Sequence, residues 1–156
     1  KSRNCPLKNF KLLILISYLK LFFISFLAAT ILPLSSEIVL TTMLITNLFD
    51  KNFLLIFSSL GNILGSIFNW YLGKKINLYK EKKWFPVSTE QLKKSQYYFN
   101  KFGLWSLLLA WVPIIGDPIT LLAGVLKVRF SIFLFLVSIS KISRYIFIIY
   151  LSNYLV

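Results

Sequence analysis

Four charged side chains lie inside apolar stretches of the sequence or directly beside them at a break, where an unpaired charge is costly. Lys141 and Arg144 are three residues apart, so on a helix they occupy one face. Each would cost roughly 2.5–3.5 kcal/mol if it faced lipid at the centre of a bilayer. Glu37 and Asp117 are the acids that pair with them most readily, because two acids balance two bases. We predict that all four side chains face a common interior site.

Two chemical roles are open to this charge-balanced site. Lys141 and Arg144 would bind an anionic head group, since a guanidinium fork matches phosphate geometry. An acid that changed its protonation as the ligand entered would link transport to protons. The alternative is a purely structural cluster of ion pairs. Glu37 and Asp117 have a further alternative in capping, because a carboxylate near a helix N-terminus satisfies free N–H groups and complements the dipole.

The composition argues against catalysis and favours a membrane protein. Hydrophobic residues form 57% of the 156 positions, and the mean hydropathy is +0.72. Five carboxylates, no histidine and one cysteine leave few groups for acid–base or metal chemistry, so we expect no enzyme and no metal or cofactor. The net charge of +13 comes mainly from basic residues between the apolar runs, which indicates membrane topology and not nucleic-acid binding.

Apolar stretches of two lengths indicate an all-α integral membrane protein. A helix needs about 20 residues to cross the hydrocarbon core. Stretches 12–32, 53–72 and 130–150 have this length, whereas 38–49 and 119–126 are too short and stand beside prolines. Broken backbone survives at membrane depth only inside protein or beside a watery cavity. The sequence therefore predicts a few transmembrane helices plus two broken, re-entrant half-helix elements.

The two breaks have matching sequences. Glu37 lies four residues after one proline and Asp117 four residues after another, and apolar residues follow both acids. This match indicates an internal repeat. Paired broken segments in corresponding halves are typical of secondary transporters, whose binding site lies at the repeat interface. The residues predicted to form the re-entrant loops are Pro33, Ser36, Pro113, Gly116 and Pro118.

The polar segment 74–101 is rich in lysine and is predicted to be cytoplasmic by the positive-inside rule. Basic residues place the N-terminus on the same side, so an even number of crossings would separate the two and the first broken element would cross once overall. The side of the C-terminus is left open. Ser88 starts a capping-box sequence that predicts a helix on the membrane surface. The lysines of this segment only set the orientation of the chain in the membrane or, alternatively, recruit anionic lipid head groups.

Small residues recur every four positions in the second long apolar stretch and directly after it. A face of this kind lets another helix approach closely. We predict that it packs against a neighbouring helix, with docking of a partner protein as the alternative. The residues are Gly61, Gly65, Asn69 and Gly73.

Four ordered motifs carry a family resemblance over nearly the whole chain. They are Ser25–Thr30 leading to Pro33 and Ser36-Glu37, then Gly61-Asn62-x-Leu64-Gly65 with Asn69 and Leu72-Gly73, then Trp111-x-Pro113-x-x-Gly116-Asp117, then Lys141-x-x-Arg144-Tyr145. Together they resemble the YqaA-like branch of the DedA superfamily, also called the SNARE-associated or VTT domain membrane proteins.

The resemblance implies a bacterial inner-membrane protein in which two re-entrant loops meet near the bilayer centre. The superfamily includes undecaprenyl-phosphate translocases and phospholipid scramblases, some of them dependent on the proton-motive force. By position, Glu37 resembles the family's functional acid and Arg144 a basic residue of its last conserved helix. The chain departs from the pattern at 116–118, where other branches carry an arginine-containing motif, and at Ser140, where glycine is usual.

The sequence as a whole predicts a transporter or scramblase of an anionic lipid, of the undecaprenyl phosphate or phospholipid class. The alternatives are a proton or ion pathway and a structural subunit of a membrane assembly. We expect residues 1–156 to form a single membrane domain. The expected partners are membrane lipids and, as a possibility that the small number of full spans raises, further copies of the chain.

Overall fold

The computed structural model describes residues 6–30, 35–75, 97, 99, 101–112 and 115–155, and every regular element within them is helical. For this part of the chain the predicted all-α architecture is confirmed. The helices are α1 (Pro6–Thr30), α2 (Ser35–Ile45), α3 (Lys51–Lys74), η2 (Gly103–Trp111, a 3-10 helix), α5 (Gly116–Val125) and α6 (Phe130–Leu155).

Helix lengths fall into the two classes that the sequence predicts. Parts of α1, α3 and α6 are long and apolar enough to cross a membrane, namely Phe10–Thr30, Lys51–Lys74 and Phe130–Ser152. α2 has 11 residues and α5 has 10. At 1.5 Å per residue each reaches about 15–17 Å, half of a hydrocarbon core about 30 Å thick. Three candidate spans thus accompany two half-length helices, an arrangement consistent with re-entrant elements.

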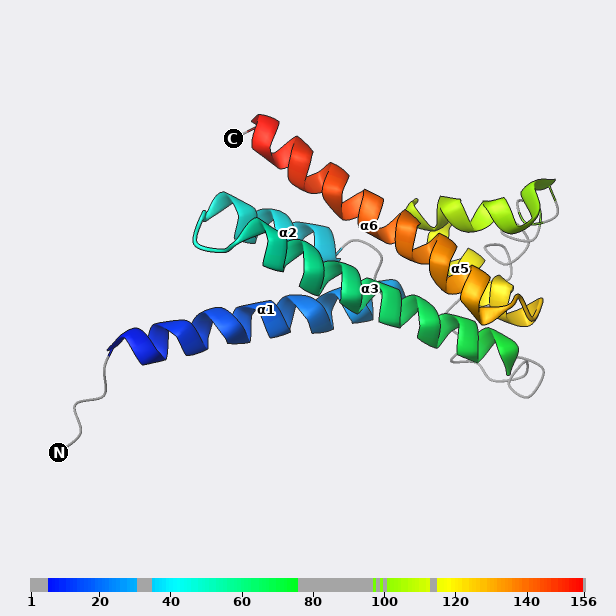
Figure 1. Ribbon diagram of the computed structural model, residues 1–156, viewed down its shortest axis with the longest axis horizontal. Coiled ribbons are helices and arrows are strands. Elements are labelled where there is room, and N and C mark those ends of the chain that lie inside the picture. The colour runs from blue at the N-terminus through cyan, green and yellow to red at the C-terminus, as the bar shows by residue number, and fades with distance from the viewer. Residues whose placement is uncertain are drawn as a thin grey trace.

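The helix directions form an inverted repeat. Figure 1 shows α1 and α3 running in the same direction, with α2 turning back between them. α6 runs opposite to α3, and η2 with α5 turns back from the other end of the molecule. The order α1, α2, α3 is therefore repeated as η2, α5, α6 with reversed direction. Broken helices in such an inverted repeat are the arrangement from which transporters build central sites.

The helix directions bear on the predicted topology at the first break. α2 turns back, and α3 then runs in the same direction as α1. α3 begins beside the middle of α1, where the Asp50 N–H donates to the Tyr18 hydroxyl at 2.9 Å, and it ends at Lys74. Charge counting does not detect this reversal, because a half-length helix turns back without any charged marker. The membrane sides expected for the N-terminus and for segment 74–101 stay predictions.

Glycines bring α3 into backbone contact with two other helices. A Cβ at Gly61 or Gly65 would meet carbonyl oxygens of α1, and a Cβ at Gly73 would meet the carbonyl oxygen of Leu121 in α5. Gly124 of α5 is equally close to the backbone of α3 at Trp70. The small-residue face is thus covered by α1 and α5 of the same chain, which is the packing role proposed for it.

α5 ends in a Schellman motif, which turns the chain into α6. The Lys127 N–H donates to the Gly124 carbonyl at 3.0 Å, and the Val128 N–H donates to the Ala123 carbonyl at 2.9 Å. Lys127 has a φ of 55°, in the left-handed region where glycine is usual at this position. A side chain there costs roughly 1–2 kcal/mol. The chain therefore keeps a lysine where the backbone favours glycine.

The predicted helix on the membrane surface lies mostly outside the described residues. Four residues at its end, Tyr97, Phe99, Lys101 and Phe102, are helical. The Lys101 ammonium lies 5.8 Å from the ring centre of Tyr97 and 5.5 Å from that of Phe102. Both distances are within the reach of a cation–π contact.

Candidate functional site

Two basic side chains project from the middle of α6. Lys141 is 1% exposed and Arg144 is 7% exposed, and no aqueous solvent surrounds groups so deeply buried. Their separation of three residues places them on one face of the helix. A buried cation requires a compensating anion or hydrogen-bond acceptors, so the partners of these two groups determine what the site does.

Arg144 pairs with Glu37 in the first turn of α2. The Arg144 Nε donates to Glu37 Oε1 at 2.7 Å, and Nη2 donates to the same oxygen. One edge of the guanidinium is therefore fully directed at one carboxylate oxygen. This edge is the part of arginine that recognises carboxylate and phosphate groups through two parallel N–H donors.

Lys141 pairs with Asp117 in the first turn of α5, with 2.9 Å between Nζ and Oδ1. α5 has Ile115 at its N-cap and no side-chain capping hydrogen bond. The Asp117 carboxylate is therefore used for the ion pair, and its contribution to α5 is limited to a favourable charge near the helix dipole. The structure thus places each base against one acid, each acid on a different half-length helix.

The acids are the accessible members of both pairs. Side-chain exposure is 29% for Glu37 against 8% for Arg144, and 22% for Asp117 against 1% for Lys141. A molecule that approaches either pair therefore meets the carboxylate before the base. Withdrawal of the carboxylate would leave a buried cation in need of another anion.

A hydrogen-bonded relay lies directly beside the Arg144–Glu37 pair. The Asn62 amide of α3 donates to the Tyr145 hydroxyl at 2.8 Å, and this hydroxyl donates to Ser36 Oγ at 3.3 Å. Ser36 and Tyr145 are the chain neighbours of the two paired residues. The start of α2 is therefore fixed to α6 by two adjacent contacts, and the hydrogen bond from Asn62 fixes the position of the tyrosine hydroxyl.

Asn69 of α3 joins the two breaks. Its side-chain nitrogen donates to the Ala29 carbonyl near the end of α1 at 2.8 Å, and lies 3.5 Å from Thr120 Oγ1 in α5. The Thr120 hydroxyl in turn donates to the Asp117 carbonyl at 2.7 Å. Ser140 of α6 donates to the Leu108 carbonyl of η2 at 2.9 Å. Polar side chains therefore donate hydrogen bonds to backbone carbonyls around both half-length helices. Lipid chains could not supply these donors.

The structure describes three of the five residues that were predicted to form the re-entrant loops. Ser36 is buried and belongs to the relay, and Gly116 lies so close to Ala110 that a Cβ would meet its backbone. Pro118 is buried in the first turn of α5, where proline is tolerated because its N–H would have no helical partner. Pro33 and Pro113 lie outside the described residues. That the four charged residues form a substrate or proton site stays a prediction.

Sequence reasoning gave no role at the site to several polar residues that the structure places there. Tyr145, Asn62 and Thr120 are 0%, 3% and 0% exposed, and each lies within hydrogen-bonding distance of a residue from another helix. Their position within apolar helices was the available signal, because polar groups at membrane depth face the protein interior. In the part of the chain that the structure describes, no group of three or more His, Cys, Asp or Glu residues could hold a metal ion.

Buried ion pairs at two facing breaks, in a chain with three candidate spans, define an α-helical integral membrane protein. Residues 32–154 match the VTT domain. The chain belongs to this family, within the DedA superfamily, as its motifs indicated.

Several curated relatives have similar length and sequence. The chain is 35% identical over 131 residues to the inner membrane protein YqaA of Escherichia coli K12, which covers 84% of this chain and 87% of the relative. The YqaA protein of Shigella flexneri has the same identity and coverage. A protein of Haemophilus influenzae is 29% identical over 146 residues, 85% of each chain. No solved structure matches the chain.

Proposed function

We propose that this protein moves an anionic lipid across the membrane and that the lipid phosphate binds Arg144 and Lys141. The observation that carries the proposal is the pairing of two buried bases on one helix face with two more exposed acids from separate half-length helices. Undecaprenyl phosphate and phospholipids both present the phosphate that such bases recognise.

The exchange of anions is the core of the proposed mechanism. A phosphate that reached the site would displace Glu37 from the guanidinium edge, where Nε and Nη2 already converge on one oxygen. The displaced carboxylate would face the more exposed side and take up a proton or be hydrated there. Because one anion replaces another, the buried charge stays balanced throughout. Lys141 would bind the phosphate in the same way once the Asp117 carboxylate has moved away from it.

The inverted repeat supports transport and not catalysis. The two acids lie at the starts of half-length helices that run from the centre toward opposite ends of the molecule, so each ion pair ties the half-length helix of one end to α6. The family names of the relatives are not those of enzymes. We infer an inner-membrane location, as for the YqaA relatives, with the end of the molecule that carries Lys74 and Lys101 toward the cytoplasm.

Leaflet exchange in reconstituted liposomes tests the proposal. Labelled phospholipids and undecaprenyl phosphate are followed in vesicles that contain wild type or the double variant Glu37→Gln, Arg144→Ala. We expect exchange of at least one lipid by wild type and loss of it in the double variant. Asp50→Asn is the matched control, since it also removes a carboxylate but keeps an N-cap for α3. Equal exchange by wild type and the double variant would refute the proposal.

A proton pathway is the second candidate, favoured by the relay beside Glu37. Asn62, Tyr145 and Ser36 link three helices beside the acid, and Asn62 Oδ1 is buried without a hydrogen-bond partner among the described residues. Vesicles loaded with a pH-sensitive dye and containing neither undecaprenyl phosphate nor labelled lipid would report this activity. Proton flux that Tyr145→Phe abolishes, without any leaflet exchange, would favour this function over lipid transport.

A further inference from the structure

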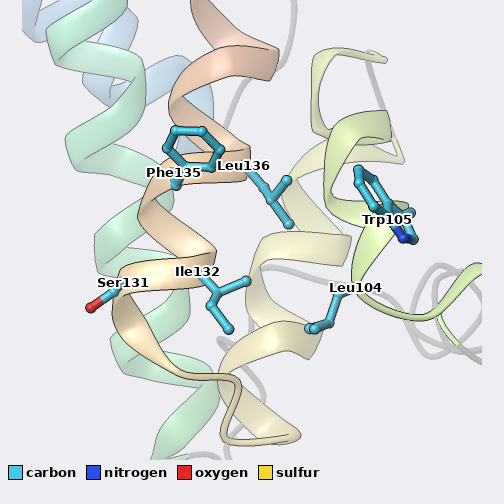
Figure 2. Close-up of a pocket in the computed structure, with 6 residues that line it drawn as sticks. All are labelled: Leu104, Trp105, Ser131, Ile132, Phe135 and Leu136. Atoms are coloured by element: carbon cyan, nitrogen blue, oxygen red, sulfur yellow. The ribbon is translucent and has the colours of Figure 1, made fainter.

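An apolar groove lies away from the ion pairs, between η2 and the first turns of α6. Its volume is about 410 Å³, within the range of roughly 300–1,000 Å³ typical of small-molecule sites. Figure 2 shows Leu104, Ile132 and Leu136 directed into the space between the two helices, whereas the hydroxyl of Ser131 points away from it. The residues that line the groove are Leu104, Trp105, Ser131, Ile132, Phe135 and Leu136.

Basic residues mark one end of this groove. Arg129 accepts the hydrogen bond that starts α6, from the Phe133 N–H at 3.0 Å, so it lies within one turn of Ile132. Lys127 lies two residues earlier, and Lys101 lies three residues before Leu104 in the chain. All three are exposed. The described acids are used elsewhere, since Glu37 and Asp117 are in ion pairs and Asp50 caps α3 at the other end of the molecule.

Lys127 adds an independent indication that charge matters at this end. Its left-handed backbone would be relaxed by glycine, yet the chain has a lysine there. An outlier of this kind is a reason to look for a function of the side chain. The exposed indole of Trp105, 70% accessible, adds the aromatic group that membrane proteins place near the interface with water.

We propose that the groove binds one hydrocarbon chain of an anionic phospholipid whose phosphate lies against Lys127 and Arg129. The occupant has to combine an apolar chain with an anionic group, because the lining is apolar and the adjoining end is basic. A membrane phospholipid has both and reaches the groove laterally. This site is separate from Glu37, Asp117, Lys141 and Arg144, and it does not depend on transport.

Quenching of tryptophan fluorescence by brominated lipids tests the site. The protein is placed in vesicles that contain phosphatidylglycerol or phosphatidylcholine brominated on the chains, at equal mole fraction. The difference between wild type and Trp105→Phe isolates the signal of Trp105 from the other three tryptophans. We expect brominated phosphatidylglycerol to quench this signal more strongly, and added salt to reduce the preference because it screens exposed charges.

The double variant Lys127→Gln, Arg129→Gln should abolish the preference for phosphatidylglycerol, with roughly a fivefold loss of relative affinity for each charge removed. The matched control is Lys11→Gln, Lys20→Gln, which removes two exposed charges from α1. Equal quenching by the two lipids in wild type, or an unchanged preference in the Lys127, Arg129 variant, would overturn the proposal. So would protection of Trp105 from both lipids in a dimer, since a second copy would then fill the groove.

A variant that fills the groove tests the binding of the hydrocarbon chain separately from the binding of the head group. Ile132→Phe should reduce quenching of Trp105 by chain-brominated lipid, while the variant still elutes and unfolds as wild type does. Unchanged quenching would show that no chain occupies the groove. Leaflet exchange by Glu37→Gln, Arg144→Ala is a separate measurement, so failure of the lipid site and failure of the transport proposal are distinguishable.

Discussion

Removal of one partner from the Lys141–Asp117 pair should destabilise the protein by an amount that depends on which partner is removed. Asp117→Asn leaves a lysine that is 1% exposed without its counter-charge. Loss of one partner from a buried pair costs about 3–5 kcal/mol. Lys141→Met instead leaves an acid that is 22% exposed and lies in the first turn of α5, where the helix dipole favours it. Because the remaining acid is partly exposed, we expect this change to cost about 1 kcal/mol, as for a more exposed ion pair.

The double variant Asp117→Asn, Lys141→Met should be far more stable than the two single effects together suggest. Replacement of a whole buried pair by groups without charge is often nearly neutral, so we expect a coupling free energy of roughly 4–6 kcal/mol between the two positions, close to the sum of the two single effects. Unfolding in mixed micelles of SDS and a non-ionic detergent, followed by far-UV circular dichroism, measures all four proteins. Asp50→Asn is the control and should unfold close to wild type, because asparagine also caps α3.

Two results would refute this reasoning. If Lys141→Met were as destabilising as Asp117→Asn, the difference in exposure between the two side chains would not determine the cost. If the single effects simply added, the 2.9 Å contact would contribute nothing of its own.

Three further predictions use the same unfolding assay. Tyr145→Phe should cost about 1 kcal/mol, because the Asn62 amide loses its buried partner, and an unchanged stability would argue against the relay. Gly65→Ala should cost roughly 1–3 kcal/mol, because a Cβ there meets the backbone of α1, whereas Leu64→Ala on the exposed face should cost less; a reversed order would contradict the packing. Lys127→Gly should stabilise by roughly 0.5–1 kcal/mol by relaxing a φ of 55°, and a loss of stability would contradict that assignment.

Charge balance in the sequence identified the residues of the ion pairs but not their pairing. Two acids and two bases allow two pairings, and the observed one follows from the inverted directions of α2 and α5 against α6. Hydropathy and length predicted α1, α3 and α6 because about 20 apolar residues are a strong signal. The two half-length helices were found through the prolines beside them.

The return of α2 and the hydrogen-bonded relay were harder to predict for physical reasons. The return of α2 leaves no trace in the distribution of lysines, since the positive-inside rule counts only crossings. Asn62 and Tyr145 are 83 positions apart, and single polar residues in apolar helices do not reveal which helix they face. The spacing of Gly61, Gly65 and Gly73 did reveal a close-packing face, because glycines at this spacing leave one face of the helix almost without side chains.

The distance along the chain between the paired residues has a consequence for biosynthesis. Arg144 follows Glu37 by 107 positions, whereas Lys141 follows Asp117 by 24. At roughly 5–20 residues per second, about 5–20 s pass after Glu37 is made before its partner exists, against about 1–5 s for Asp117. We therefore expect α2 to wait longer than α5 for its partner, at the water interface, where its unpaired acid is hydrated. In ribosome-bound chains that carry Cys5→Ser and Ser36→Cys and end before Arg144, the thiol at position 36 should be open to a water-soluble reagent, because this position is buried only in the finished protein. Protection of this thiol would show earlier docking.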